Sequence, residues 1–475
     1  MAAPGATTRF IDGEVTQRLM KGVDLSVLIL GGVVLGVMFL PMEGPNASAI
    51  LGFLAVVLGL GTVLIIRGLG LYDPRRWGRG AVAAAKSLLA AMAAGLGFYL
   101  VSGLAFGAAS QNWALGWVAL AAMHFPLTRL AAQAWALPAE QAGRFVPRIA
   151  IVGGGKAAEE AINTLENSRG LAVNIVGLFD DRNDNRSPES VRAVGKLGKI
   201  ADLASYARHN RVDLIIVAIP LSAEQRLLQI LKRLWELPVD IRISGQSSTL
   251  KLSPRAYSHL GNLPLLAVFD RPLSGWGLFM KETMDRIIAS LAIIMLAPVM
   301  AAVALAVRLE SKGPVIFRQK RYGFNNELIE VFKFRSMYTD MSDATASKLV
   351  TKGDPRVTKV GRIIRKTSLD ELPQLFNVLT GQLSLVGPRP HATQAKAAEA
   401  LYEQVVDGYF ARHKVKPGIT GWAQINGWRG ETDTREKIEQ RVKYDLDYID
   451  RWSLGLDLTI LAKTPFALLK SENAY

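Results

Sequence analysis

Two adjacent carboxylates, Asp370 and Glu371, lie within TSLDELPQLFNVLTG, a stretch whose apolar residues recur at helical spacing. Pro373 is tolerated only in the first turn of a helix, and Gly381 is well placed to end one. The acids therefore lie at a helix N-terminus, which binds phosphate. One carboxylate there is suited to attack phosphorus, and its neighbour to hold Mg²⁺. The alternative is a helix cap, because Ser368 and Glu371 match the S-x-x-E capping box.

Several basic residues occur near these two acids in the sequence, and they favour the catalytic interpretation over the helix cap. They are Lys333, Arg335, Arg356, Arg362, Arg365 and Arg389. Guanidinium groups grip phosphate oxygens in pairs, so this many cations indicate a site for a very anionic ligand, such as a nucleotide diphosphate or a lipid phosphate. Gln424, in the loop VKPGITGWAQINGWRGE, is a candidate hydrogen-bond partner for a sugar or base, and a plain loop contact explains it equally well.

The composition of the chain indicates which class of protein contains these residues. The chain has 475 residues, half of them hydrophobic, and a net charge of +15. Its mean hydropathy of +0.20 predicts part membrane and part soluble domain. Nucleic acid is disfavoured as a partner, since there is no zinc-finger spacing or aromatic RNA-binding signature. The absence of cysteine excludes disulfides, thiolate nucleophiles and iron–sulfur clusters.

Four apolar runs, roughly residues 25–40, 49–66, 87–106 and 113–128, predict transmembrane helices over residues 1–140. Lysine and arginine flank the bundle and fill the loop between the second and third runs. The loops around 42–46 and 107–112 have neither residue. The positive-inside rule therefore places both ends of this bundle in the cytoplasm.

A soluble α/β domain is predicted over residues 145–265. RIAIVGGGKAAEEAINTL reads as a strand, a glycine turn and a helix, and Gly153, Gly155 and Ala158 fit G-x-G-x-x-A. The strands NIVGLFDD and VDLIIVAIP follow. This is a Rossmann-like pattern. A nucleotide pocket and a domain that kept the turn but lost the ligand are equally good interpretations.

A fifth apolar run, about residues 285–308, has basic residues on both sides. If it spanned the membrane, one basic flank would lie outside, against the positive-inside rule. Pro298 near its middle bends a helix, and Ser290 is suited to bond backbone carbonyls near the entering turn. We expect a re-entrant helix that enters the cytoplasmic leaflet, kinks and returns. A proline-kinked fifth span is the alternative.

The motifs SLDELPQLFNVL, SLVGPRP, KFRSM, KPGITGWAQINGWRG and YIDRWSL together resemble the bacterial sugar transferase family, the monotopic phosphoglycosyl transferases. The resemblance is strongest over residues 278–475. It implies a fold of a four-helix transmembrane bundle, a central Rossmann-like α/β domain and a C-terminal α/β monotopic catalytic domain with a re-entrant helix. It also implies a bacterial inner-membrane location with the catalytic domain on the cytoplasmic face.

The resemblance further implies transfer of a hexose 1-phosphate, glucose being the first expectation, from a UDP-hexose to undecaprenyl phosphate. That reaction releases UMP and primes exopolysaccharide or O-antigen synthesis. Asp370 matches the nucleophile, and Glu371 matches its partner tied to Mg²⁺. Lys333, Arg365 and Arg389 match residues that position phosphate. Asp445 matches an acidic residue, which we expect to be a second metal ligand.

Two other functions stay open at this stage. One is a nucleotide-sugar-modifying enzyme that uses NAD in the Rossmann-like domain, although that domain has no Tyr-x-x-x-Lys pair and Tyr206 is followed by Asn210 at that spacing. The other is a non-enzymatic scaffold of polysaccharide assembly, which would leave the acids and arginines without a role. The helix bundle and the Rossmann-like domain are candidate surfaces for a homodimer.

Overall fold

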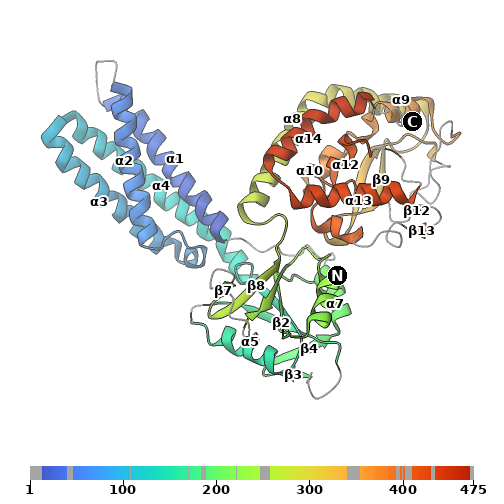
Figure 1. Ribbon diagram of the computed structural model, residues 1–475. Coiled ribbons are helices and arrows are strands. Elements are labelled where there is room, and N and C mark those ends of the chain that lie inside the picture. Colours follow the sequence, from blue (N-terminus) through green and yellow to red (C-terminus); the bar gives the residue numbers. More distant parts are fainter. Residues whose placement is uncertain are drawn as a thin grey trace. The chain divides into compact units, whose positions relative to one another are not determined.

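The computed structural model divides into two compact units, Met1–Pro147 and Arg148–Tyr475 (Figure 1). It describes residues 13–39, 47–106, 108–169, 171–182, 189–220, 222–245, 257–339, 354–391, 396–397, 400–401, 409–428, 430 and 434–470. The outward loop predicted around 42–46 lies outside these residues. The extent of the second outward loop, predicted around 107–112, is wrong, because a helix begins at Ala108. The boundaries predicted at 140, 145, 265 and 278 stay predictions.

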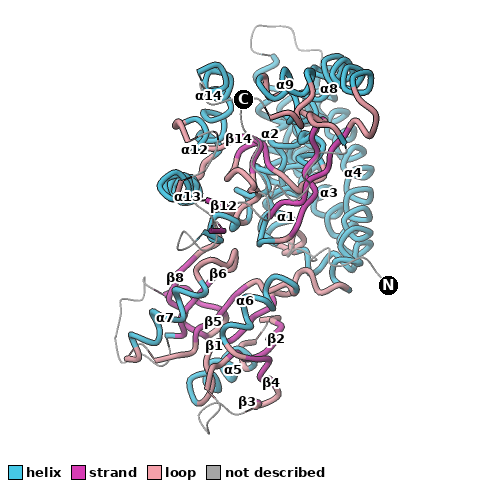
Figure 2. The backbone as a smooth tube through the Cα atoms, turned by 90° about the vertical axis from the view of Figure 1, so that its right-hand side faces the viewer, coloured by secondary structure: helices cyan, strands magenta, loops and turns pink. Residues whose placement is uncertain are grey.

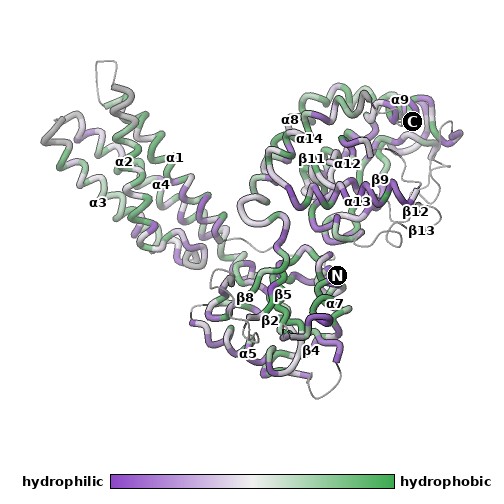
Figure 3. The backbone as a smooth tube through the Cα atoms, in the orientation of Figure 1, coloured by the Kyte–Doolittle hydropathy of each residue, from purple (hydrophilic) through white to green (hydrophobic). Residues whose placement is uncertain are grey.

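The first unit consists of long apolar helices, as predicted. They are α1 (Gly13–Phe39), α2 (Ala47–Gly68), α3 (Gly80–Phe106) and α4 (Ala108–Gln141), with a short 3-10 helix η1 (Pro74–Arg79) before α3. At 1.5 Å per residue, the 27 residues of α1 extend about 40 Å, enough to cross a bilayer. Figure 3 shows hydrophobic residues along most of these helices.

Tryptophans of α4 close the centre of this bundle. Trp113 and Trp117 are fully buried, and their indole N–H groups donate to the backbone oxygens of Gly32 and Leu28 in α1, at 2.8 and 3.2 Å. Large apolar side chains on the outer surface are exposed instead, for example Met123 at 76%. A bundle with polar groups satisfied inside and apolar groups outside is suited to lipid.

A buried ion-pair cluster ties three segments of the bundle together. Asp24 of α1 accepts hydrogen bonds from Arg129 Nη2 at 2.6 Å and from the Tyr72 hydroxyl at 2.7 Å, and it lies 2.9 Å from His124 Nε2. Asp24 and Arg129 are essentially inaccessible to solvent. Charged groups in such surroundings are retained only when paired, so the packing of α1, α4 and the loop after α2 depends on this cluster.

An eight-stranded sheet opens the second unit (Figure 2). Its strands are β1 (Arg148–Val152), β2 (Asn174–Phe179), β3 (Ser190–Val191), β4 (Val194–Gly198), β5 (Leu214–Val217), β6 (Asp240–Ser244), β7 (Tyr257–Leu260) and β8 (Leu263–Phe269). They lie in the order β3-β4-β2-β1-β5-β6-β8-β7. The central strand β1 pairs in parallel with β2 and β5, which confirms the predicted Rossmann-like pattern.

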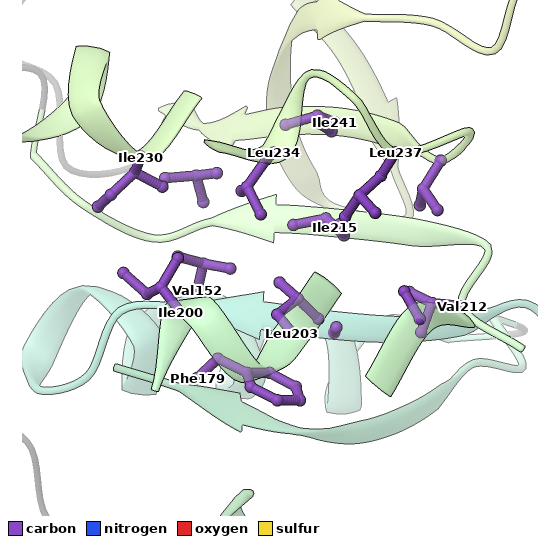
Figure 4. Close-up of a cluster of buried hydrophobic side chains, with 14 of the residues drawn as sticks. Val152, Phe179, Ile200, Leu203, Val212, Ile215, Ile230, Leu234, Leu237 and Ile241 are labelled. Carbon is purple, nitrogen blue, oxygen red and sulfur yellow. The ribbon is translucent and has the colours of Figure 1, made fainter. Parts of the chain in front are cut away.

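Alternating side chains of this sheet build two hydrophobic layers. Val152, Phe179 and Ile215 pack against α6 (Ile200–His209) and α7 (Glu224–Leu234), as Figure 4 shows. Ile149 and Ile151 face the opposite layer with α5 (Lys156–Glu166). Helices on both faces of a largely parallel sheet give this domain a core of its own.

The C-terminal region alternates short strands with helices around the predicted motifs. Its elements are α8 (Gly275–Glu310), β9 (Ile316–Tyr322), η4 (Phe324–Asn326), β10 (Leu328–Phe334), α9 (Lys359–Lys366), η6 (Leu369–Glu371), α10 (Gln374–Leu379), β11 (Ser384–Val386), β12 (Lys396–Ala397), β13 (Ala400–Leu401), η7 (Tyr409–Lys414), β14 (Gly418–Thr420), α12 (Trp422–Ile425), α13 (Arg435–Asp450) and α14 (Leu454–Lys470). Strands β9 and β10 pair antiparallel as a hairpin. Strands β11 and β14 pair in parallel.

Both halves of α8 pack on this same C-terminal region. Before Pro298, Ala289 belongs to the core that contains Val378 of α10. After Pro298, Val303 and Val307 pack in the core that contains Ile364 of α9. The residues on the other side of the helix are apolar and exposed, among them Ile294 at 72% and Met295 at 78%. The helix thus offers an apolar outer face while neither half departs from the domain.

A buried polar network fixes the start of α8. Lys281 Nζ lies 2.8 Å from Asp457 of α14 and 3.2 Å from Asp285. Asp285 in turn accepts a hydrogen bond from Ser384 of β11 at 2.6 Å. Because these groups are almost fully buried, the network holds α8 at a defined position on β11 and α14.

Replacing Arg129 with methionine is expected to destabilise the helix bundle by about 3–5 kcal/mol, because Asp24 would be left buried without its cation. Thermal unfolding of purified variants in detergent measures the effect. Arg18→Met is the matched control, since Arg18 pairs with Glu14 on the surface and should contribute less than about 1 kcal/mol. Equal unfolding temperatures for the two variants would show that the buried pair does not stabilise the bundle.

Candidate active site

Asp370 and Glu371 lie in the 3-10 turn η6, between α9 and α10. The predicted helix begins later than Asp370, because α10 starts at Gln374, after Pro373. Proline lacks the N–H that an α-helical bond requires, so the chain passes through a 3-10 turn first. Gly381 ends the helix with a positive φ of 78°, as predicted.

Glu371 does not serve as the capping-box acid that the sequence also allowed. The Ser368 side chain makes no capping hydrogen bond, and its backbone is left-handed, with φ of 57°. Glu371 Oε1 instead accepts from Lys333 Nζ at 2.9 Å, and Oε2 accepts from Arg389 Nη1 at 3.1 Å. Arg389 Nη2 donates to Oε1 as well. The glutamate is therefore held by two cations from distant elements.

Asp370 is in a different state from its neighbour. It is 9% exposed, and among the residues the structure describes, its carboxylate has no hydrogen-bond or salt-bridge partner. Burial raises the pKa of Asp370. Burial opposes ionisation of Glu371 too, but Arg389 and Lys333 bring the pKa of that carboxyl well below its ordinary range. One acid is fixed as a paired anion, and the other is left with its oxygens available.

The β9–β10 hairpin positions Lys333. Asn377, fully buried in α10, accepts a hydrogen bond from Phe332 N at 2.9 Å and donates to Glu330 O at 2.7 Å. These bonds hold the backbone of β10 immediately before Lys333 against the helix that follows the acids. The sequence analysis did not single out Asn377.

Arg321 is a further cation of this site that the sequence analysis missed. It lies on β9 opposite Ile329, and Lys333 lies opposite Phe317, so both cations are on one face of the hairpin. Arg321 Nη1 donates to Pro390 O at 2.6 Å, next to Arg389. Burial and the charge of Arg389 lower its pKa to about 10. Strand alternation within FRQKRYG was the signal that would have identified it.

Of the other predicted cations, one lies near Asp370 and two are bonded elsewhere. Arg365, in the last turn of α9, is near enough to lower the pKa of Asp370, although less than burial raises it. Arg335 lies at the end of α8 instead, where it donates to Ser311 O at 2.7 Å and Lys312 O at 3.1 Å. Arg356 forms a pair with Asp354 at 2.6 Å. These contacts satisfy helix and loop groups and do not bring Arg335 or Arg356 to the acids.

The two remaining predicted residues, Gln424 and Ser290, lie on different helices, α12 and α8. In α12, the buried Oε1 of Gln424 has no hydrogen-bond partner among the described residues, which suits a ligand contact. Ser290 was expected to bond carbonyls freed near the entering turn, but it donates to Arg286 O at 2.8 Å instead. The carbonyl that lacks its usual donor because of Pro298 is two turns further along, at Ile294.

Mg²⁺ was predicted on Glu371 and Asp445. Asp445 of α13 is buried and paired with Arg412, at 2.5 Å. No group of three or more acidic, histidine or cysteine residues forms a metal cage within the described part of the chain. A pair of carboxylates nevertheless fits Mg²⁺, which usually keeps several waters and binds one or two carboxylates together with substrate phosphates. Asp370 and Glu371 are such a pair.

Positive charge dominates the site. The cations Lys333, Arg321, Arg365 and Arg389 outnumber the two carboxylates. A surplus of partly desolvated cations favours a ligand that carries several negative charges.

The glycine turn of the Rossmann-like domain is occupied by the chain's own carboxylate. Asp180, at the end of β2, accepts a hydrogen bond from Gly154 N at 2.8 Å and is 3% exposed. In a dinucleotide site, the N–H groups of this turn point at the pyrophosphate. Asp180 stands at the end of β2, where dinucleotide sites carry the acid that bonds the ribose, and Arg226 lies 3.6 Å from its carboxylate.

Comparison with known proteins matches two family descriptions. Residues 276–471 match the bacterial sugar transferase family, and residues 68–245 match a CoA-binding domain. The first range contains all the residues of the candidate site. The second contains β1 to β6 of the sheet, which are the strands around the glycine turn.

Full-length relatives extend the similarity beyond the catalytic region. The chain is 41% identical to undecaprenyl-phosphate glucose phosphotransferase of Komagataeibacter xylinus over 333 residues, which is 70% of this chain and 61% of that protein, less than two thirds of its length. It is 39% identical to UDP-glucose:undecaprenyl-phosphate glucose-1-phosphate transferase of Escherichia coli K12 over 327 residues, 69% of this chain and 68% of that protein.

A shorter relative matches less of this chain. The exopolysaccharide production protein PSS of Rhizobium leguminosarum is 45% identical over 187 residues, which cover 39% of this chain and 94% of that protein. The similarity to the long relatives extends over more residues than the 196 that match the sugar transferase description. The chain therefore belongs to the bacterial sugar transferase family.

Proposed function

We propose that this protein is a phosphoglycosyl transferase that moves glucose 1-phosphate from UDP-glucose to undecaprenyl phosphate, releasing UMP. The observation that carries the proposal is the unequal state of two adjacent carboxylates: Glu371 is held by Lys333 and Arg389, whereas Asp370 has no such partner in the described part of the chain. Relatives are named for this reaction, and another is named for exopolysaccharide production, which supports a priming role.

The reaction has two displacement steps at one phosphorus atom. In the first, an oxygen of Asp370 attacks the β-phosphorus of UDP-glucose, the bond to the bridging oxygen breaks, and UMP leaves. Glucose 1-phosphate is then held on Asp370 as an acyl phosphate. In the second, an oxygen of undecaprenyl phosphate attacks the same phosphorus, and the Asp370 carboxylate leaves. The product is undecaprenyl diphosphate glucose.

The chain's own cations stabilise the charge that develops in both steps. Lys333 and Arg389 are fixed by Glu371, so their remaining N–H groups point from a preorganised position. When bound, Mg²⁺ would neutralise phosphate oxygens, and Glu371 together with Asp370 would hold it. Gln424 is placed to bond the nucleotide or sugar through its unpaired Oε1.

Membrane attachment supplies the lipid substrate. Leu369 and Leu372 flank the acids and pack in the same cluster as Val303 and Val307 of α8. The acids are thus directly connected to an apolar helix, which suits a lipid acceptor. Both halves of α8 pack on one domain, which supports a re-entrant course from the cytoplasmic face of the bacterial inner membrane.

A non-enzymatic scaffold explains less of the molecule. It gives no reason for a site in which cations outnumber carboxylates, or for a buried aspartate that has no hydrogen-bond or salt-bridge partner among the described residues. Such groups are costly unless they act on a ligand.

Asp370→Asn is expected to lower lipid-dependent UMP release by more than about a thousandfold, because the amide is not a nucleophile. Purified wild type with UDP-glucose, Mg²⁺ and undecaprenyl phosphate gives the reference rate. Glu436→Gln, on the exposed side of α13, is the matched control and should stay near wild type.

A covalent step also predicts a burst without the lipid. Wild type mixed with UDP-glucose alone should release about one UMP per enzyme and carry glucose phosphate on the protein. If UMP appeared only when lipid was present, Asp370 would act as a base for direct attack. If no UDP-sugar gave UMP under any condition, the transferase function would be wrong.

Lys333→Met should move the acidic limb of the kcat/KM profile to higher pH. Lys333 lowers the pKa of Asp370, against the rise that burial causes. Without it, Asp370 becomes protonated at a higher pH, and activity is lost earlier as pH falls. Lys320→Met, an exposed lysine on the neighbouring strand β9, is the control and should leave the profile unchanged. An unshifted limb in Lys333→Met would show that Asp370 does not set it.

The course of α8 can be tested because the chain contains no cysteine. Single cysteines at Ser274 and Lys312, which flank α8, should both react with a membrane-impermeant maleimide in inverted vesicles, and neither should react from outside intact cells. Asn112→Cys, at the predicted outer end of the bundle, should react only from outside. Labelling of one flank of α8 from each side would establish a spanning helix instead.

A further inference from the structure

The backbone around Arg389 is held at three successive carbonyl oxygens by three different elements. Pro388 O accepts from Gly418 N of β14 at 3.0 Å, and Pro390 O accepts from Arg321 Nη1 at 2.6 Å. Between them, Arg389 O accepts from Arg412 Nη2 at 2.7 Å. Proline fixes φ on either side of Arg389, so little freedom is left in this segment.

Arg412 is unusual because a fully buried guanidinium bonds this backbone. It lies on η7 with no exposed surface, and its Nη2 also donates to Asp445 Oδ2 at 2.5 Å. A buried guanidinium cannot lose its proton and therefore needs a counter-charge. Asp445 supplies it, and one nitrogen atom links that carboxylate to the carbonyl of Arg389.

A neutral histidine completes the surroundings of Arg412. Arg412 Nη1 donates to His391 Nδ1 at 2.7 Å, and the Tyr409 hydroxyl lies 2.8 Å from the same atom. Burial and the charge of Arg412 hold the pKa of His391 well below its ordinary value. His391 therefore adds no charge, and Asp445 faces the guanidiniums of both Arg412 and Arg441.

These contacts indicate that Asp445 acts on other residues of the protein and not on a bound ligand. Its carboxylate is 2% exposed and bonded to a permanent cation, in a network that leads to the main chain of Arg389. The side chain of Arg389 leaves this fixed backbone and reaches Glu371 with two nitrogen atoms. A shift of the carbonyl would redirect that side chain, and small misplacements at an active site cost much activity.

We propose that Arg412 and Asp445 form a positioning pair that aims Arg389 at Glu371 and the substrate phosphates, and that Asp445 is not a ligand of the catalytic metal. This inference rests on the proposed transferase function. From the family resemblance we expected Asp445 to be a metal ligand. The inference instead has Asp445 act through Arg412 on the position of Arg389.

The test compares Asp445→Asn, Arg412→Met and the double variant in full-length protein, with UDP-glucose and undecaprenyl phosphate. Each single variant should lower kcat by about 10- to 100-fold, and the double variant should lose little more, because the pair acts as one unit. The Mg²⁺ concentration for half-maximal rate should stay within about twofold of wild type. A metal ligand would instead raise it about tenfold or more in Asp445→Asn alone.

Dependence on Arg389 gives the decisive comparison. In an Arg389→Ala background, adding Asp445→Asn should change the residual rate less than about twofold, because the residue through which it acts is gone. A further large loss there, or a changed Mg²⁺ requirement, would overturn the proposal.

Arg412→Lys guards against loss of folding, since it keeps a cation beside Asp445. It should unfold at nearly the wild-type temperature and still show reduced kcat, because one ammonium does not reproduce the planar fork. Full activity in Arg412→Lys and Asp445→Asn would exclude the positioning role. Failure of wild type to release UMP would instead refute the proposed function itself.

Discussion

The pairing of Glu371 with Lys333 and Arg389 is the interaction on which the rest of the catalytic region depends. The pairing joins η6 to the β9–β10 hairpin and to the segment after β11. Along the chain, Lys333 lies 38 residues from Glu371 and Arg389 lies 18 residues from it. These three side chains are half-buried, so removing one partner leaves a partly desolvated charge without its counter-charge. The surrounding elements are therefore constrained to bring both cations to one carboxylate. That constraint also separates the roles of two neighbouring acids.

Attachment of the membrane helix follows from a second buried network. Lys281, Asp285, Asp457 and Ser384 connect the start of α8 to β11 and α14. Strand β11 leads directly into the segment that carries Arg389. The apolar helix α8 and the arginine that pairs with Glu371 are thus fixed to the same short strand. The proposed transfer of a soluble sugar nucleotide's phosphate to a membrane lipid requires such a shared frame.

The N-terminal unit and the Rossmann-like domain are stabilised independently of this site. The bundle has its own ion-pair cluster around Asp24, and the sheet has hydrophobic layers on both faces. A relative that matches 39% of this chain over 94% of its own length is in keeping with this modular organisation. In the glycine turn, Asp180 bonds Gly154, so a motif that can bind a nucleotide here satisfies its backbone from within the domain.

The sequence by itself determined the local features of this protein. Apolar runs predicted the four N-terminal helices, strand and glycine patterns predicted the central sheet, and the position of Pro373 placed the acids before a helix. Family motifs selected Asp370, Glu371, Lys333 and Arg389. These properties follow from periodicity and backbone preferences that act over a few residues.

Only the tertiary structure decided which cations reach the acids. Arg335 turns to the end of α8, Arg321 faces the site, and Asp445 bonds Arg412. Lysine and arginine have the same charge wherever the chain carries them, and their contacts depend on elements brought together from far apart in sequence. Burial of Asp370 and pairing of Glu371 are properties of that assembly, because desolvation and counter-charges exist only after the elements have packed.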